Sequence, residues 1–375
     1  IENSTLQPCP GNLLWPGIIA KGNDAIAQIN GTNFNSSQTQ VFVENSTIEY
    51  AEYGIWAGDV GCTGGSTYAD IAPFECSGGA VVRCRNTNFL NCMRGVIFNS
   101  YSFDNYSYFV DCNFEWNDPE PWYNEWETYG DQQKSFWGAY EMVHLNEVKG
   151  VSFLGGNEFI NSVEFNDWDG EQVDKDADGN PDTESNGDPI DVHYLEYGSS
   201  NENRGRGIFS RLSSFIVRRG GNCYDQPNDV SGTGGYECVG NVNTFEGFYA
   251  AISISEYQDI GEIDPISDNS IAITGTIFWD NSVAVFCYEK LLNLFINRCK
   301  VSNHAEYSTL GGNFLGFYRY FVKFRPQGFI VLSQIRNKCE ISDNKVYFLE
   351  KDASSSWGRS TTVCDMEDWK VNFND

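Results

Sequence analysis

The sequence is poor in basic residues. It has 24 lysines and arginines against 52 aspartates and glutamates, which gives a formal net charge of −28. Nucleic-acid binding depends on Lys and Arg side chains that neutralise phosphates, and anionic membrane surfaces attract polybasic segments. The charge balance therefore argues against nucleic acid and against anionic lipid as partners.

Long hydrophobic runs are missing too. The most apolar stretch, residues 314–332, is interrupted by three basic residues and by Pro326. We therefore expect no membrane-spanning helix. The first residues, from Ile1 on, do not have the basic and then apolar pattern of a signal peptide. We expect such a peptide to have been removed or to lie upstream.

Two groups of catalytic and metal-site motifs are absent. The three histidines, His144, His193 and His304, stand in no triad-like phrase, and there is no G-x-S-x-G sequence. None of the 12 cysteines forms a C-x-x-C pair. The sequence thus disfavours a serine-nucleophile elbow and a zinc site of the paired-knuckle type.

The cysteines that are present suggest an oxidising compartment. Cys62 and Cys76 bracket one Gly-rich segment, and Cys223 and Cys238 bracket another. Each pair would close a short loop as a disulfide, a use typical of exported proteins. The alternative is that several cysteines are buried thiols, since Cys also packs as a small hydrophobe. Five N-x-S/T sequons agree with export; they begin at Asn3, Asn30, Asn35, Asn45 and Asn105.

A short phrase recurs along the chain. It opens with Asn or Gly, continues with a large apolar residue, then with small residues, and ends in an alternating apolar run. The large apolar residue of successive copies is Ile48, Phe89, Phe159, Phe245 and Phe278. Later variants surround Cys299 and Cys339.

This repeat predicts an all-β fold. Segments such as 41–45 and 271–275 alternate with period two, as half-buried strands do. Asn and Gly stand between the strands, where sharp corners are needed. Short strands and corners that recur after tens of residues are typical of a solenoid. We predict a single right-handed parallel β-helix over residues 1–375 with about ten or more coils. A β-sandwich or propeller is the alternative, but few Asn-Gly or Asp-Gly hairpin signals occur.

Three segments interrupt the repeat and are predicted to be long loop insertions. They are the Gly-rich residues 57–80, the aromatic residues 115–147 and the acidic residues 164–205. Insertions of this kind decorate one side of a scaffold and often carry its binding function.

The acidic insertion contains the most specific motif of the sequence. Residues 174–182 match the D-x-D-x-D-G-x-x-D start of a calcium loop. Calcium is a hard cation that takes six to eight oxygen ligands, and the predicted ligands are Asp174, Asp176, Asp178, Asn180 and Asp182. Ser185 stands where an EF-hand has its closing Glu, so Glu184 or Asp188 would have to complete the site. The alternative is a solvated acidic loop.

Two weaker binding sites are also predicted. Arg204, Arg206 and Arg211, followed by Arg218 and Arg219, form a basic cluster in an acidic chain. They would either bind an anionic sugar or pair with the acidic insertion, and we favour pairing. In the aromatic insertion, Trp122 and Trp126 could stack on sugar rings. Loops of this length more often turn their aromatic side chains inward.

The opening of the sequence resembles a known family. Residues 12–22, Asn-Leu-Leu-Trp-Pro-Gly-Ile-Ile-Ala-Lys-Gly after Cys9, resemble the start of β-helix repeats in exported surface proteins of the Bacteroidota. The likeness continues through 43–58 and 79–118 and is patchier up to 345. It implies a pectin-lyase-like β-helix exported by the type IX route, and it carries over no catalytic residues. A type IX C-terminal signal domain is not evident.

These observations favour a non-catalytic role. We expect an extracellular or cell-surface scaffold that binds calcium, as an adhesin or a polysaccharide-binding module. Its expected partners are a polysaccharide or a cell-surface protein assembly, including type IX secretion components. The alternative is a polysaccharide lyase or glycoside hydrolase on the same fold. The acidic character argues against a uronate polymer as its substrate.

Overall fold

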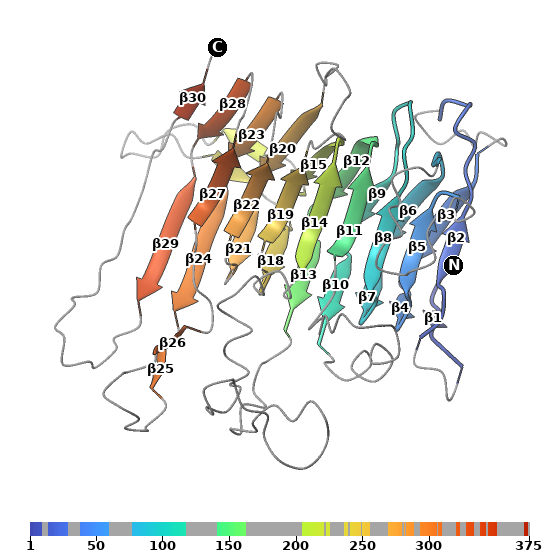
Figure 1. Cartoon of the computed structure of the whole chain (residues 1–375), viewed down its shortest axis with the longest axis horizontal. Helices are drawn as coiled ribbons and strands as arrows, with labels where there is room; N and C mark the ends of the chain where they lie inside the picture. Colours follow the sequence, from blue (N-terminus) through green and yellow to red (C-terminus); the bar gives the residue numbers. More distant parts are fainter. Residues whose placement is uncertain are drawn as a thin grey trace, which may run out of the picture.

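The structure is a computed structural model, and it describes the parts of the chain that build three sheets. The described residues are 1–9, 14–28, 38–59, 77–117, 141–162, 205–220, 223–225, 236–238, 241–248, 250–255, 269–279, 281, 283–288, 293–305, 307–309, 320–322, 328–333, 338–342, 344–350 and 371–373. Within these ranges the fold is all-β and contains no helix (Figure 1).

The three large sheets have nine, eight and nine strands. The first sheet contains β1 (Thr5–Leu6), β4 (Thr47–Glu49), β7 (Asn88–Leu90), β10 (Asn113–Trp116), β13 (Glu158–Asn161), β18 (Thr244–Glu246), β21 (Ile277–Trp279), β24 (Lys300–Ala305) and β29 (Lys345–Glu350). The second contains β2 (Ile18–Ala20), β5 (Tyr53–Ala57), β8 (Arg94–Phe98), β11 (Glu141–Asn146), β14 (Arg206–Arg211), β19 (Ala250–Ser255), β22 (Val283–Tyr288) and β27 (Gly328–Ser333). The third contains β3 (Gln40–Glu44), β6 (Val81–Arg85), β9 (Tyr108–Val110), β12 (Lys149–Leu154), β15 (Ser214–Arg218), β20 (Ser270–Thr274), β23 (Asn293–Asn297), β28 (Lys338–Ser342) and β30 (Val371–Phe373).

Successive strands visit the three sheets in rotation. For example, β4 lies in the first sheet, β5 in the second, β6 in the third and β7 in the first again, parallel to β4. The rotation continues to β29, with two antiparallel hairpins between strands: β16 (Cys223–Asp225) with β17 (Tyr236–Cys238), and β25 (Tyr307–Thr309) with β26 (Tyr320–Val322). All pairings within the large sheets are parallel except that of β28 with β30. This arrangement is consistent with the expected parallel β-helix or solenoid.

Stacked phenylalanines form the centre of the core. Phe89, Phe114, Phe159, Phe245 and Phe278 occupy the same register position on five neighbouring strands of the first sheet. Their ring centroids lie 4.3–5.5 Å apart, and the ring planes differ by 3° to 20°. Four of the five are the large apolar residues of the recurring phrase. The phrase is therefore repeated because each strand must supply one residue to a continuous buried stack.

The opening residues of the phrase form corners of the chain. Asn45, Asn86, Gly156 and Gly275 all have φ between 44° and 66°. This left-handed backbone conformation is strained for most residues but is tolerated by Gly and Asn. The Asn/Gly preference of the phrase therefore follows from the backbone of the turn into the first sheet.

A column of buried residues, polar except for one cysteine, lies just before the strands of the first sheet. Thr87, Cys112, Asn157, Asn243 and Asn344 each precede one of these strands and are at most 1% exposed. The Asn157 side chain accepts a hydrogen bond from the Cys112 backbone N–H at 3.1 Å and donates one to the Phe109 carbonyl at 3.1 Å. These side chains satisfy backbone groups at the turn that the strand ladders leave unpaired.

Several cysteines belong to the core. Cys84, Cys92, Cys112 and Cys299 are at most 2% exposed and form no disulfide. Burial raises the pKa of the Cys92, Cys112 and Cys299 thiols to about 12. For these four residues, packing as small hydrophobes explains their presence.

The described strands reach into two predicted insertions. β5 ends at Ala57, the first residue of the predicted insertion 57–80. Within residues 115–147, β10 extends to Trp116 and β11 starts at Glu141. The sequence of β11, EMVHLN, does not have a clear apolar alternation because Glu141 and His144 occupy two of its buried positions. The described part of the chain contains no helix long and apolar enough to cross a membrane.

Candidate functional site

Most of the predicted site residues lie outside the described residues. This holds for the calcium ligands Asp174, Asp176, Asp178, Asn180 and Asp182, for Trp122, Trp126 and Arg204, and for Cys62 and Cys76. In the described part of the chain, no group of three or more His, Cys, Asp or Glu residues is arranged to hold a metal ion.

The backbones of Cys223 and Cys238 are described. They belong to the β16–β17 hairpin, and Cys223 is directly opposite Cys238 in the antiparallel register. Directly opposite residues in such a ladder have Cα atoms about 4.5–5.5 Å apart. This spacing lies within the range of about 4.4–6.8 Å that a disulfide requires. The register therefore permits the predicted bond, which stays a prediction.

Arg206 and Arg211, two residues of the predicted basic cluster, lie on β14 in the second sheet. The register of this sheet sets Arg94 of β8, Glu141 of β11 and Arg206 of β14 side by side on three neighbouring strands. Glu141 is thus flanked by an arginine on each side. Equal register positions on parallel strands bring these residues together although they are far apart in the sequence.

The two arginines pair with Glu141 through different oxygens. Arg94 Nε lies 2.9 Å from Glu141 Oε2, and Arg206 Nη1 lies 3.7 Å from Glu141 Oε1. The Glu141 side chain is 5% exposed, against 13% for Arg94 and 23% for Arg206. A carboxylate at such depth requires charged partners, because an isolated buried charge is strongly unfavourable.

His144 completes this group. Its Nδ1 lies 3.1 Å from Glu141 Oε2, and its ring centroid lies 5.0 Å from that of Phe209. The guanidinium of Arg206 also lies over the Phe209 ring, 5.2 Å from its centroid. We name Arg94, Glu141, His144 and Arg206 the Glu141 cluster. Phe209 fixes both the His and the Arg by ring contacts, which favours one arrangement of the cluster.

The charges around Glu141 determine its protonation. Burial alone would raise its pKa, but Arg94, His144 and Arg206 outweigh burial and hold the pKa of Glu141 well below its ordinary value. Glu141 is therefore a carboxylate at any physiological pH. It cannot donate a proton, and both of its oxygens already face cationic or hydrogen-bonding groups.

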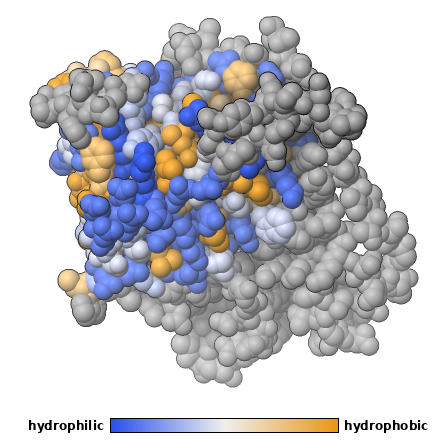
Figure 2. Space-filling model, turned by 180° about the vertical axis from the view of Figure 1, so that it is seen from behind, coloured by the Kyte–Doolittle hydropathy of each residue, from blue (hydrophilic) through white to orange (hydrophobic). Residues whose placement is uncertain are grey.

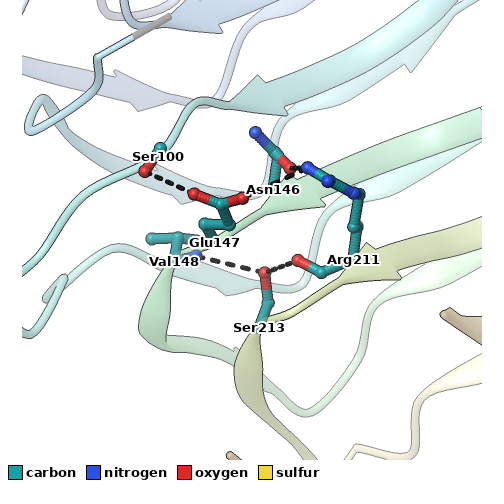
Figure 3. A network of polar contacts seen from close by, with 6 residues as sticks. All are labelled: Ser100, Asn146, Glu147, Val148, Arg211 and Ser213. Atoms are coloured by element: carbon teal, nitrogen blue, oxygen red, sulfur yellow. Dashed lines mark hydrogen bonds and ion pairs between the residues drawn. The ribbon is translucent and has the colours of Figure 1, made fainter. Parts of the chain in front are cut away.

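A second ion pair lies at the turn after β11 and β14 (Figure 3). Arg211 Nη1 donates hydrogen bonds to Asn146 Oδ1 at 3.1 Å and to Glu147 Oε1 at 3.2 Å. The other oxygen of Glu147 accepts a hydrogen bond from Ser100 Oγ at 2.9 Å. Glu147 has φ 49°, so this pair stabilises a strained corner.

At the same turn, the Ser213 side chain forms two hydrogen bonds, one of which reaches the neighbouring segment after β11. Ser213 Oγ donates to the Arg211 carbonyl at 2.7 Å and accepts from the Val148 backbone N–H at 3.1 Å. The contacts drawn in Figure 3 therefore connect three segments at one corner: Ser100 after β8, residues 146–148 at the end of β11, and residues 211–213 at the end of β14. Arg211 takes part in these contacts with both its guanidinium and its carbonyl.

An apolar group adjoins the Glu141 cluster on the second sheet. Tyr53 of β5 pairs with Arg94 of β8 in the parallel register. Trp56 of β5 pairs with Ile97 of β8, which in turn pairs with His144 of β11. Tyr53, Trp56 and Ile97 are at most 6% exposed and form a cluster separate from the main core. Trp56 Nε1 donates to Asn99 Oδ1 at 3.1 Å. These three apolar side chains therefore pack together on the second sheet, apart from the main core.

The sequence carries a signal for the Glu141 cluster in three short phrases of the second sheet. Arg94 and Arg206 each precede Gly and then a β-branched residue, as Tyr53 does. Glu141 stands before Met142 and Val143 at the same position. Aligning these short phrases places the three charged residues on one register line.

Comparison with known proteins gives no relative. No protein-family model, no curated protein and no solved structure matches the chain.

Proposed function

We propose that the chain is a right-handed parallel β-helix that serves as a non-catalytic extracellular or cell-surface scaffold, as an adhesin or a polysaccharide-binding module exported by the type IX route. The rotation of consecutive strands through three parallel sheets supports the β-helix. Crossovers between parallel strands of one sheet are right-handed in almost all proteins, which supports the handedness.

The observation that carries the non-catalytic role is the state of Glu141. A glycoside hydrolase uses one carboxylic acid with a raised pKa as a proton donor. The pKa of Glu141 is shifted in the opposite direction by Arg94 and Arg206. In the same way, Arg211 is held by Glu147 and Asn146. These ion pairs support a structural role for the charged groups described on the second sheet.

The proposal includes a calcium ion bound by Asp174, Asp176, Asp178, Asn180 and Asp182. Its support is the spacing of the sequence motif and the charge of the surrounding segment. Residues 164–191 contain eleven acidic side chains and a single basic one, Lys175. A cation would relieve the repulsion within this segment, and its role would be structural.

The test combines thermal unfolding with a panel of polysaccharides. Calcium is expected to raise the melting temperature of the full chain, and Asp176→Asn is expected to reduce that shift. No polymer of the panel should yield unsaturated uronates or new reducing ends. Product formation from any polymer would overturn the non-catalytic role and favour the lyase or hydrolase alternative.

A further inference from the structure

The stack of sheets is open at the end where the chain starts. β1, β2 and β3 are the first strands of the three sheets and lie together at one end of the molecule (Figure 1). Within the described residues, no strand pairs with the outer edge of β1 or of β2. Such an edge presents unpaired backbone N–H and C=O groups, which can pair with another strand. We name the surface formed by β1, β2 and the described residues between them the end surface.

The core is covered less completely at the end surface than inside the stack. Leu6 of β1 and Ile18 of β2 pack against the core but are only partly buried. Their partners one strand further in, Ile48 and Ile55, are fully buried. Ile19 of β2 is 46% exposed. Apolar side chains at this end would therefore lose contact with water if a second surface covered them, which favours association.

The sequence around the end surface is almost uncharged. Residues 3–43 contain two charged side chains of opposite sign, Lys21 and Asp24, although 20% of the whole chain is charged. Lys21 in addition lies 2.7 Å from a carboxylate oxygen of Asp59. The net charge of −28 therefore comes from the rest of the chain. Depletion of charged residues is typical of the centre of protein–protein interfaces. A neutral surface also lets two strongly acidic molecules meet with little like-charge repulsion.

We infer that the end surface binds the end surface of a second copy of this chain. A two-fold axis between the two molecules sets β2 antiparallel to its copy and brings Ile19 close to the partner subunit's Ile19. Such a contact is self-complementary and closes after two subunits. Because β2 has only three residues, side-chain contacts must contribute most of the affinity. The inference goes beyond the proposed scaffold function, which a monomer would serve equally well.

The other end of the stack argues against head-to-tail association. β30 is the last strand of the third sheet and pairs antiparallel with β28. It covers that edge of the sheet and interrupts the parallel order that a head-to-tail continuation would need. β30 and the end surface lie at opposite ends of the molecule (Figure 1). The described surface seen in Figure 2 is mainly hydrophilic, with separate hydrophobic residues, so it offers no large apolar patch for association in that view.

The test is sedimentation velocity of the full chain at about 1–100 µM, the range in which a contact of micromolar affinity is half-formed. We expect the mass to rise from 42.2 kDa to about twice that value. Ile19→Asp places two like charges close together across the two-fold axis, so the dissociation constant should rise at least about hundredfold. Ile216→Asp is the matched control, because Ile216 is 39% exposed and lies on β15, inside the third sheet. It should leave the dissociation constant unchanged.

Cross-linking keeps the test decisive if Ile19→Asp weakens folding. In a Cys9→Ser background, Ile19→Cys should be joined to a second copy by a short bismaleimide. Ile216→Cys should give no more cross-linked dimer than the background alone. A monomer at all concentrations, an unchanged dissociation constant in a folded Ile19→Asp, or equal cross-linking of the two cysteine variants would each overturn the inference. Growth beyond a dimer would overturn it too, because it would show a contact that does not close.

Discussion

Asn157 Nδ2 donates a hydrogen bond to Asn243 Oδ1 at 2.8 Å, although the two residues are 86 positions apart in the sequence. Both side chains are fully buried. They precede neighbouring strands of the first sheet, β13 and β18, which pair in register through Phe159 and Phe245. The long intervening segment, which includes the acidic insertion, therefore leaves the stacking of the sheets continuous.

Replacing Asn157 should destabilise the protein. In Asn157→Ala, the backbone N–H of Cys112 and the Phe109 carbonyl lose their buried partner. An unsatisfied buried polar group costs about 1–3 kcal/mol in the free energy of unfolding. Urea denaturation measures this loss. As a control, Asn88→Ala alters an exposed asparagine of β7 and should change stability by less than about 0.5 kcal/mol. Equal stability of the two variants would contradict the role of the buried column.

The phenylalanine stack predicts a dependence on side-chain volume. Phe159 contacts Phe114 and Phe245, with ring planes parallel to within 3°. Phe159→Ala should cost about 3–5 kcal/mol of unfolding free energy because it opens a cavity in the core. Phe159→Leu keeps most of the volume and should cost clearly less. A similar loss for both variants, measured by denaturant titration, would argue against a stack that depends on filled volume.

Removing the charge of Glu141 should leave two arginines without their counter-charge. Breaking a fully buried ion pair costs about 3–5 kcal/mol. Since Arg206 retains 23% exposure, we expect about 2 kcal/mol for Glu141→Gln at neutral pH. Glu158→Gln changes an exposed carboxylate of β13 and is the matched control. A loss for Glu141→Gln no larger than that of the control would contradict the ion-pair assignment.

The same pair predicts the sign of a pH effect. The pKa of Glu141 is lower in the folded protein than in the unfolded chain, where it is about 4.3. Its stabilising contribution is therefore present above about pH 4.3 and is lost as the pH falls toward the folded pKa. The difference in unfolding free energy between wild type and Glu141→Gln should shrink from pH 7 to pH 3. A difference that grows on acidification would contradict the depressed pKa.

The hairpin register predicts one disulfide and several protected thiols. Peptide mapping without reductant should find Cys223 linked to Cys238, a bond that closes a loop of about 15 residues and stabilises by about 3 kcal/mol. Cys92, Cys112 and Cys299 should react with iodoacetamide only after unfolding, because burial raises the pKa of their thiols to about 12. Alkylation of Cys223 and Cys238 in the folded, unreduced protein would show that the bond is absent.

The sequence contained the core of this fold because a stacked structure repeats its constraints. Phe89, Phe159, Phe245 and Phe278 could be recognised from the phrase around them, and the corner residues Asn45 and Asn86 from the need for left-handed backbone. The Glu141 cluster could not be found in this way. Arg94 is 47 positions from Glu141, and their contact depends on how many residues each pass inserts before it returns to the sheet. Because insertions change the number of residues between successive strands of one sheet, the spacing in the sequence does not reveal which residues pair. The packing of the whole stack fixes this register.

We expect the chain to form one uninterrupted stack that presents side chains at fixed intervals. Thr47, Asn88 and Lys300 lie on one outward register line of the first sheet, with Asn113, Glu158, Thr244 and Ile277 on the strands between Asn88 and Lys300. Spin labels can be attached at these positions in a Cys9→Ser background, which removes the one exposed thiol among the free cysteines that the structure describes. At about 4.8 Å per strand, dipolar EPR should give label separations near 29 Å for Thr47–Lys300 and near 24 Å for Asn88–Lys300. Two separations that differ by about one strand spacing would support the stack; equal, much longer or broadly distributed separations would contradict it.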